Sequence, residues 1–405
     1  MSEWLKSTIA RLLVAWERRE SGVAYDLLSP QLRQDPYPVY REMRSKDPVH
    51  RMRLVKAWAL TRYEDVERVL RDDKRFCSSD RVLVKTIPLS LLDMDPPEHT
   101  RVRALVSKAF TPKAVGKLRG RVQEITDRLL DEVAGKRRFD VVGALGYPLP
   151  VTVIAEMLGV RSEDMGVFET WSNTLALAVD PILGGKQVQA IRQAAEQVSA
   201  YFEEIIAERR SEPRDDLVTA LIMAEEAGER LTHEEMLSVM RLILVAGNET
   251  TRNLIGNGVL ALLRNPEQLQ RLREDRGLLG SAVDELLRYD SPVQLDGRAA
   301  REDVEVGGKL IRAGDVVISV LGAANRDPEA FDDPESLDVG RRGNSHLSFG
   351  RGVHYCLGGP LAIMEARTAL AGLLDRYASM RLAMEPEYRE GVALRGVERL
   401  WIEVD

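Results

Sequence analysis

The 405-residue sequence has only two cysteines, Cys77 and Cys356, and they stand far apart. This scarcity excludes a disulfide framework and a CxxC zinc site, and it fits a protein kept in a reducing cytosol. The five histidines form no HExxH pattern, so the zinc-protease signature is missing as well. No apolar run reaches the ~20 residues that a membrane-spanning helix needs, and the N-terminus lacks a cleavable signal pattern. We expect a cytoplasmic protein.

Basic residues are outnumbered in this chain. Its 57 Lys and Arg face 64 Asp and Glu, which gives a formal net charge of −7. An acidic protein gains nothing from releasing phosphate counterions, so we expect no nucleic-acid partner. Hydrophobic residues make up 44% and charged residues 30%, a balance typical of a globular protein rather than of a disordered or membrane-embedded one.

Helical periodicity dominates from Tyr63 onward, and strand patterns are short. Strands are expected within residues 49–61 and 303–321, the latter with a hairpin turn on Gly307 and Gly308. Helices are expected after Pro96 and Pro97 and over residues 114–134, 150–159, 187–210, 234–264, 278–290 and 360–378. No low-complexity linker or repeat divides the chain, so we expect one domain, 1–405, mainly α with small β-sheets.

Residues 1–20 predict an additional amphipathic helix, with an apolar stripe of Leu5, Ile9, Leu12, Leu13 and Trp16 at helical spacing. Basic residues flank the stripe, so a helix lying on a membrane surface is one interpretation. We favour docking on the protein body, because most such stripes face a core.

Cys356 lies in FGRGVHYCLGG, residues 349–359, where four glycines surround it just before a predicted helix. Glycine lets the backbone approach a bulky planar group and point amide hydrogens at the sulfur. A helix N-terminus favours the thiolate, which is a good soft ligand for iron. The alternative is a buried structural cysteine.

The long predicted helix over 234–264 is apolar nearly all round except at AGNETT, Ala246 to Thr251. Burying Glu249 and Thr250 there is costly unless they are paired or used. Thr250 can bond back to the carbonyl four residues earlier, and Gly247 leaves room for a flat ligand. A polar kink in a core helix is the alternative.

Two further groups of residues are weaker signals. Glu285 and Arg288 stand three apart on one helix face, as a solvated surface pair would. Four cations come from distant segments and would form a site only if they converge on one anionic ligand: His99, Arg103, Arg298 and His354.

Taken in chain order, four motifs resemble the cytochrome P-450 family: DPPEHTRVR (95–103), AGNETT (246–251), ELLR (285–288) and FGRGVHYCLG (349–358). The resemblance runs from about residue 30 to the C-terminus, and the cysteine loop is its most specific motif. It implies the cytochrome P-450 fold, with haem b (iron protoporphyrin IX) between the long central helix and the cysteine loop. It also implies a monooxygenase that inserts one oxygen atom of O2 into an organic substrate.

The resemblance assigns roles to the matching residues. Cys356 would be the axial iron ligand, which favours O–O cleavage. Glu249 and Thr250 would form the acid–alcohol pair that relays protons to bound oxygen. Other residues would contact or support the haem: His99, Arg103, Arg298 and His354 at the propionates, Phe349 beside the sulfur, Ala246, Gly247 and Gly358 along the cofactor, and Glu285 with Arg288 locking the loop.

The sequence departs from the family pattern at two positions. Asn248 stands where many bacterial members have a histidine, which alters hydrogen bonding near the acid–alcohol pair. Ser336 stands where members often have an arginine or histidine that completes the network of Glu285 and Arg288. The third member of that network is therefore in doubt.

Aliphatic segments are expected to form the substrate pocket, with Val82, Leu83, Leu175, Leu244, Val245, Val293 and Leu295 as candidate lining residues within 82–92, 175–183, 242–245 and 293–295. Such a lining suits an apolar terpenoid, steroid, fatty acid or macrolide-like substrate. Ordinary core packing is the alternative explanation of any apolar run.

The chain has no room for a fused flavin reductase, so electrons are expected from a separate ferredoxin or flavodoxin. A basic cluster is the expected docking surface, although a solvated helix face would look the same: Arg101, Arg103, Lys108, Lys113, Lys117 and Arg119. Two other functions stay open. One is a peroxygenase of the same fold, which the Glu249–Thr250 pair argues against, and the other is a non-catalytic haem-binding protein.

Overall fold

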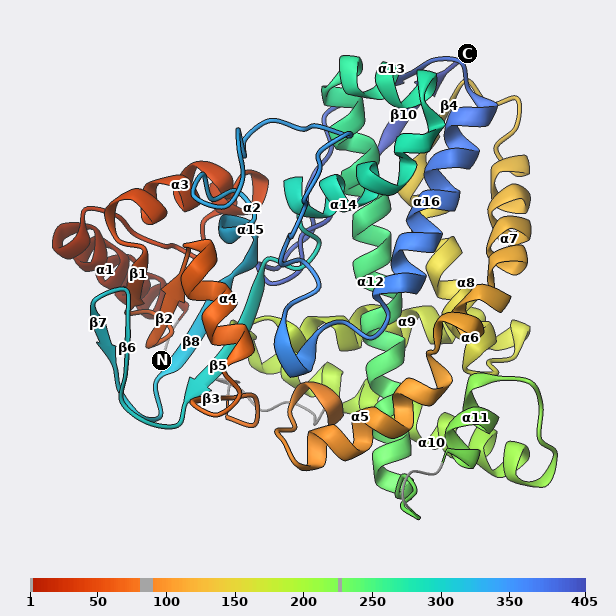
Figure 1. Ribbon diagram of the computed structural model, residues 1–405, viewed down its shortest axis with the longest axis horizontal. Coiled ribbons are helices and arrows are strands. Elements are labelled where there is room, and N and C mark those ends of the chain that lie inside the picture. The colour runs from red at the N-terminus through yellow and green to blue at the C-terminus, as the bar shows by residue number, and fades with distance from the viewer. Residues whose placement is uncertain (1–2, 81–89, 225–227) are drawn as a thin grey trace.

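The structure is a computed structural model that describes residues 3–80, 90–224 and 228–405. Most of the helices gather on one side of the molecule, and a smaller β-rich region lies on the other (Figure 1). The α-helices within the described residues are α1 Glu3–Ser21, α2 Pro30–Gln34, α3 Tyr37–Lys46, α4 Tyr63–Arg71, α5 Glu98–Ala109, α6 Pro112–Lys117, α7 Arg119–Asp131, α8 Pro148–Met157, α9 Met165–Ala176, α10 Gly185–Ser211, α11 Leu217–Met223, α12 His233–Arg264, α13 Pro266–Glu274, α14 Leu279–Tyr289, α15 Leu321–Ala324 and α16 Gly359–Arg376.

The strands form three small sheets. The largest has the order β1-β2-β8-β5-β3, with β2 and β8 parallel and the other pairs antiparallel. A second sheet has the order β4-β10-β9, and β6 pairs with β7. The bounds are β1 Val49–Met52, β2 Ala57–Leu60, β3 Phe76–Cys77, β4 Arg138–Asp140, β5 Leu295–Ala300, β6 Val304–Val306, β7 Lys309–Ile311, β8 Val316–Val320, β9 Met380–Leu382 and β10 Trp401–Val404.

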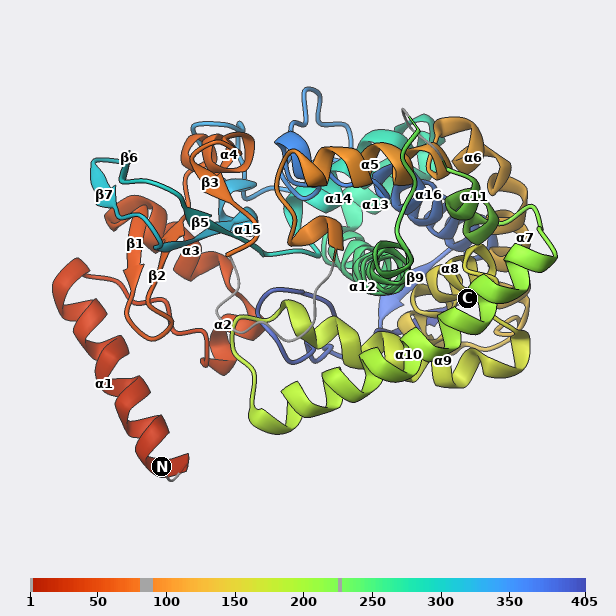
Figure 2. The ribbon, with the colours of Figure 1, turned by 90° about the horizontal axis from the view of Figure 1, so that it is seen from below.

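Helix α12 passes through the middle of the helical region (Figures 1 and 2). Thr232 and Glu235 form the expected capping box, since each side chain accepts a hydrogen bond from the other's backbone N–H. Pro266 cannot continue the ladder, and the helix ends before it. Helices α8, α9, α14 and α16 pack against α12, so most of its apolar surface is buried.

Most predicted helices are confirmed within a few residues, but the one expected over 114–134 is divided into α6 and α7 at Leu118. Gly116 and Gly120 flank the break, and glycine lowers helix stability by about 1 kcal/mol relative to alanine. The hairpin at Gly307 and Gly308 is confirmed, with φ of 54° and 76° at the two glycines. Strands β4 and β9 have only three residues each, too few to show an alternating pattern, and the four-residue β10 was not predicted.

Helix α1 extends away from the body beside β1 (Figure 2). The favoured prediction that its apolar stripe faces the core is wrong for Leu12 and Trp16, which are 65% and 54% exposed. The helix docks instead through Ala10 and Glu17, both buried. Polar contacts set this orientation, because the Glu17 carboxylate accepts a hydrogen bond from the Arg53 backbone N–H at 2.5 Å. No helix of the described residues is long and apolar enough to span a membrane.

A buried histidine holds this docking site together. His50 is 1% exposed, and its two ring nitrogens lie 2.9 Å from an Asp47 oxygen and 3.3 Å from a Glu17 oxygen. Lys309 also forms an ion pair with Asp47. Burial opposes a charge on the ring, but the hydrogen bonds and charges of Asp47 and Glu17 outweigh it and raise the pKa of His50 above 6.5. The cluster is therefore most favourable when His50 is protonated.

A raised folded-state pKa means that the stability contributed by His50 is present below its unfolded pKa and is lost as the pH rises through its folded pKa. The destabilisation caused by His50→Gln should therefore be larger at about pH 6 than at about pH 9. Thermal unfolding at both pH values measures it, with exposed His233→Gln as the control. An equal effect of His50→Gln at both pH values would contradict the assignment.

Candidate active site

The cysteine loop, residues 349–358, follows α15 in the chain and leads directly into α16. Its turn is fixed by backbone hydrogen bonds, among them Cys356 N–H to the Phe349 carbonyl at 2.9 Å. Gly352 has φ of 69°, and a Cβ there would come within 2.6 Å of the Leu70 carbonyl oxygen. Glycine is therefore required at this position, both by the left-handed conformation and by the close approach of α4.

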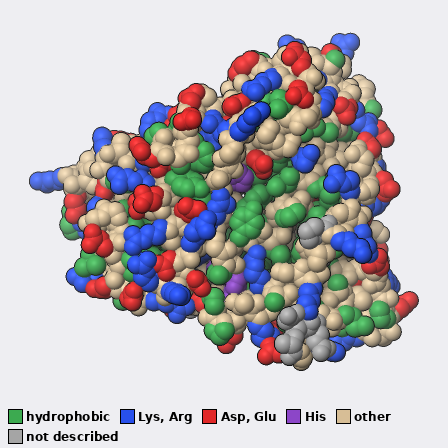
Figure 3. Space-filling model, in the orientation of Figure 1, with side chains coloured by type: hydrophobic (Ala, Val, Ile, Leu, Met, Phe, Trp, Pro, Cys, Tyr) green, Lys and Arg blue, Asp and Glu red, His purple; other side chains and the backbone are tan. Residues whose placement is uncertain are grey.

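Cys356 lines a cavity of about 700 Å³. Phe349, Tyr355 and Gly358 of the loop region line the same cavity, and α12 contributes Ala246, Gly247, Thr250 and Thr251. Hydrophobic side chains gather at the centre of the face that carries the loop, with Lys and Arg around them (Figure 3). Burial raises the pKa of the Cys356 thiol, against the backbone N–H groups of Gly358 and Gly359 and the charge of Arg103. The backbone N–H groups at the start of α16 thus lower the pKa of Cys356, as expected, but they only partly offset the increase caused by burial.

The four predicted cations converge, although they come from distant segments. The rings of His99 and His354 lie 4.2 Å apart, and Arg103 and His354 line the cavity. Burial, with the charges of Arg103 and then Arg298, lowers the pKa of His99 to about 4. Arg298 donates to an Asp296 oxygen at 2.8 Å. Both ring nitrogens of the buried His99 have no hydrogen-bond partner among the described residues.

The two threonines of α12 both hydrogen-bond back along the helix. The Thr250 hydroxyl donates to the Ala246 carbonyl at 2.7 Å, as predicted, and the Thr251 hydroxyl donates to the Gly247 carbonyl at 3.3 Å. Both threonines line the cavity. These bonds add a second donor to two carbonyls of the helix and hold two hydroxyl groups at one stretch of the wall.

Glu249 is 2% exposed and lies beside two arginines. Arg389, from the segment before β10, places a guanidinium nitrogen 2.7 Å from the carboxylate, and Arg252 lies 3.8 Å away. Burial raises the pKa of Glu249 although Arg389 lowers it. Arg389 also lies 3.6 Å from Glu398, which is 58% exposed. The two ion pairs of Arg389 thus connect a solvent-exposed carboxylate, Glu398, to the buried carboxylate of Glu249, which precedes Thr250.

Gly247 and Asn248 turn out to hold helices together. A Cβ at Gly247 would come within 2.5 Å of Ile154, so the glycine allows α8 to pack closely on α12. Asn248 donates to the Ser172 hydroxyl at 2.9 Å, and Ser172 donates to the Leu244 carbonyl at 3.5 Å. The residue that replaces the family histidine therefore connects α12 to α9.

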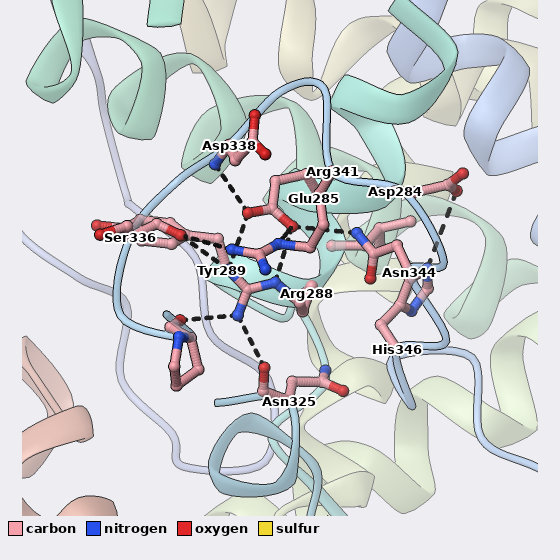
Figure 4. Close-up of polar contacts among 12 residues, drawn as sticks. Asp284, Glu285, Arg288, Tyr289, Asn325, Ser336, Asp338, Arg341, Asn344 and His346 are labelled. Atoms are coloured by element: carbon pink, nitrogen blue, oxygen red, sulfur yellow. Dashed lines mark hydrogen bonds and ion pairs between the residues drawn. The ribbon is translucent and has the colours of Figure 1, made fainter. Parts of the chain in front are cut away.

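Glu285 and Arg288 form a buried ion pair, each with a fully buried side chain. Two nitrogens of Arg288 lie 2.7 and 2.8 Å from the Glu285 oxygens, and the guanidinium also donates to three carbonyls of the loop before Cys356, those of Asn325, Pro334 and Ser336 (Figure 4). Ser336 contributes only its backbone. Arg341, five residues later, lies 3.0 Å from Glu285 and completes the network.

The predicted pocket residues divide into three groups. Val245, Val293 and Leu295 line the cavity. Val82 and Leu83 lie outside the described residues. Leu175 and Leu244 are fully buried but are not among the described residues that line the cavity, because α9 packs on α12 at this point. The prediction for these two is therefore corrected: they are packing residues.

The sequence analysis missed several lining residues, including Phe110, Ile154, Glu365 and Leu394, and within the predicted segment 175–183 it did not single out Asp180. Asp180 accepts backbone hydrogen bonds from Val392 and Ala393 at 2.8 and 3.1 Å, which connects the segment before α10 to the C-terminal loop. Burial raises the pKa of Asp180 against these two bonds. No periodic pattern marks such contacts, since each joins segments over 200 residues apart.

These residues fit haem b. A cysteine sulfur is a suitable soft ligand for iron, and the cavity walls are mostly aliphatic. The two unpartnered nitrogens of His99, beside Arg103 and Arg298, suit the carboxylates of the propionates. The fold and this arrangement define a haem-thiolate protein.

The comparisons with known proteins agree. The family model Cytochrome P-450 matches residues 27–388, and the chain belongs to this family. Cytochrome P-450 107B1 of Saccharopolyspora erythraea is 42% identical, over 94% of this chain and 98% of that protein. Cytochrome P-450 monooxygenase PikC of Streptomyces venezuelae is 42% identical, over 87% and 86%.

Solved structures are similar as well. The cytochrome P-450 PksS of the Bacillus subtilis bacillaene polyketide synthase has a TM-score of 0.88 at 37% identity, over 93% of this chain and 100% of that one. CYP109E1 of Bacillus megaterium, in complex with testosterone, has a TM-score of 0.84 at 40% identity, over 91% and 99%. The chain therefore has the cytochrome P-450 fold, is an enzyme of the P-450 monooxygenase type, and has haem as its cofactor.

The network in Figure 4 yields a test of loop anchoring. Arg341→Ala removes a charge-assisted hydrogen bond from buried Glu285 and should lower the free energy of unfolding by about 1.5–3 kcal/mol. Arg271→Ala is the matched control, because its ion pair with Asp338 is roughly half exposed on both sides and should be worth less than about 1 kcal/mol. Chemical denaturation measures both, and equal effects would count against the role of Arg341.

Proposed function

We propose that this chain is a haem-thiolate monooxygenase in which Cys356 ligates the iron and one oxygen atom of O2 enters an apolar organic substrate. The observation that carries the proposal is one cavity lined by the Cys356 sulfur, by Arg103 and His354 beside His99, and by the Thr250 hydroxyl. When bound, the haem supplies O2 activation. His99, Arg103, Arg298 and His354 would hold its propionates, and Phe349 would cover the sulfur.

The chain's own part in oxygen activation is to deliver protons. Glu249 pairs with Arg389, which also pairs with the exposed Glu398, so this chain of charges reaches solvent, from which Glu249 can take a proton. The adjacent Thr250 lines the cavity, where its hydroxyl would pass a proton on into the space that the haem and substrate would occupy. A peroxide-driven enzyme has no need of this arrangement, which therefore favours O2 and external electrons.

Turnover under ¹⁸O2 with a surrogate ferredoxin and reductase tests this function. We expect product with one ¹⁸O atom, and we expect Thr250→Ala to lower product formed per O2 consumed by about tenfold or more, because the relay group is lost. Thr126→Ala is the control. Thr126 is a buried helical threonine whose hydroxyl donates to the carbonyl four residues earlier, with a bond length of 2.8 Å, and it does not line the cavity. Product formation from hydrogen peroxide alone, with no ¹⁸O from O2, would favour a peroxygenase instead.

The substrate that we propose is a largely aliphatic molecule, such as a terpenoid, steroid, fatty acid or macrolide core. Aliphatic side chains from three segments line the cavity that also contains the cysteine: Leu91, Leu92, Val239, Leu242, Ile243, Val245, Val293 and Leu295. Relatives support this range, since solved structures include complexes with testosterone and with hexadec-9Z-enoic acid ligated acyl carrier protein.

Two nearby leucines of α12 test where the substrate pocket ends, because one lines the cavity and the other packs in the core. Leu242→Phe should change which ligands shift the haem spectrum, because Leu242 lines the cavity. Leu244→Phe is the matched control: it is equally apolar and buried but lies outside the described lining. It should lower stability by about 1–3 kcal/mol through overpacking and leave ligand preference unchanged. The opposite pattern in binding titrations would refute this placement of the pocket.

We further propose that an acidic ferredoxin or flavodoxin docks on the face of the cysteine loop. Lys108, Lys113, Lys117 and Arg119 are exposed on α5 to α7, and α5 lies beside the loop (Figure 1). Arg101 and Arg103 are less available, because Arg101 pairs with Glu235 and Arg103 donates to the Tyr355 carbonyl. Opposite charges would steer the encounter.

Reversing Lys113 and Lys117 to Glu should therefore slow reduction by the partner, and the effect should be larger at low ionic strength. Lys186→Glu with Arg192→Glu makes the same charge change on exposed positions of α10 and should leave the rate nearly unchanged. Stopped-flow reduction at two salt concentrations measures both variants. Equal slowing by the two pairs would mean that net charge, not this surface, matters.

A further inference from the structure

Asn325, the residue that follows α15, has a fully buried side chain that the function proposed above does not use. Its backbone carbonyl accepts a hydrogen bond from Arg288 (Figure 4), but its amide has other partners. Oδ1 accepts the Leu347 N–H at 2.7 Å, and Nδ2 donates to the hydroxyls of Ser291 and Ser348 at 2.7 and 2.9 Å. The amide therefore connects the end of α14 to the segment that enters the cysteine loop.

The two serines complete this network at the C-terminal end of α14. Each hydroxyl donates to the Leu287 carbonyl, at 2.9 Å from Ser291 and 2.7 Å from Ser348. This carbonyl is one of the last four of the helix, which the helical ladder leaves without a partner. Because both hydroxyl protons are used in this way, each serine oxygen accepts one of the two amide protons of Asn325.

The pattern of donors and acceptors permits only one orientation of the Asn325 amide. If its oxygen and nitrogen exchanged places, the NH2 group would face the Leu347 N–H, and two donors would meet in the core. A buried polar network that is fully satisfied specifies one arrangement, and removing one member leaves its partners unpaired. Asn325 therefore fixes where residues 347 and 348 lie.

Residues 347 and 348 lead directly to the proposed iron ligand. The Leu347 carbonyl accepts the Gly350 N–H at 2.8 Å, and the Phe349 carbonyl between them accepts the Cys356 N–H at 2.9 Å. Ser348 and Phe349 line the same cavity as Cys356. A displacement of residue 347 would therefore move Phe349 and the backbone hydrogen bond that holds Cys356.

We infer that Asn325 is a positioning residue for Cys356, which fixes the start of the cysteine loop and thereby keeps the sulfur on the iron as a thiolate. The inference rests on the proposed function, because it concerns the ligand of the haem iron. Groups behind a metal ligand orient it and control how firmly it is held. Asn325 does not line the cavity, so it acts only through Leu347 and Ser348.

Ser291 and Ser348 offer a matched pair of variants. Each hydroxyl makes one hydrogen bond to Asn325 and one to Leu287, with lengths of 2.7 and 2.9 Å in both cases. Ser291→Ala and Ser348→Ala should therefore lower Tm about equally. Only Ser348 belongs to the segment that enters the cysteine loop. A network with a structural role alone would make the two variants alike in every respect, whereas the inference requires them to differ at the haem.

The measurement is the rate at which the haem-loaded, reduced enzyme under carbon monoxide loses its red-shifted Soret band, at one temperature below the Tm of every variant. We expect this loss to be about tenfold faster in Asn325→Ala and Ser348→Ala, as for one buried hydrogen bond removed. It should be nearly unchanged in Ser291→Ala. Hydrogen–deuterium exchange of residues 345–356 should be faster in the same two variants and unchanged in Ser291→Ala.

If Asn325→Ala does not fold, the comparison of Ser348→Ala with Ser291→Ala carries the test. The inference is overturned if these two serine variants lose the band at the same rate. It is also overturned if Ser348→Ala stays within about twofold of the wild type, less than one hydrogen bond would give. A wild type that never shows the red-shifted band would instead defeat the proposed function itself.

Discussion

The position of Cys356 depends on the buried ion pair of Glu285 and Arg288. Arg288 uses its guanidinium to hold Glu285 and three carbonyls of the loop between α15 and the cysteine, while Glu285 also accepts from Asp338 and Asn344. A buried ion pair adds little net stability, because desolvation offsets its attraction. Its geometric effect is larger: removing either charge leaves the other uncompensated in the core, so the loop has a single satisfied arrangement.

The same constraint, that a buried polar group needs a partner or a use, organises the rest of the site. Asn248 has a partner in Ser172, and Glu249 has one in Arg389. The ring nitrogens of His99 and the carboxyl of Glu365 have none among the described residues. Apart from Arg389, which lies in the segment before β10, these groups lie on helices that pack around or line one cavity. We assign the unpartnered ring nitrogens of His99 to a haem propionate.

Local signals in the sequence predicted much of this arrangement. The capping box at Thr232 and Glu235, the glycine hairpin, and the glycines around Cys356 each specify backbone geometry within a few residues. The pairing of His99 with His354, and the roles of Arg341 and Arg389, could not be predicted from spacing, because these contacts join segments that only the tertiary fold brings together. The apolar stripe of α1 misled the analysis for a related reason. The hydrogen bonds of Glu17 to β1 and the segment after it, invisible in a periodicity, decide which face docks.

The central claim is that Cys356 is the thiolate ligand of a haem. The absorption spectrum of the purified protein, reduced and then exposed to carbon monoxide, tests it most directly. The account predicts a strongly red-shifted Soret band that is lost in Cys356→His. A band like that of histidine-ligated haem in the wild type, or a protein that takes up no haem, would contradict it.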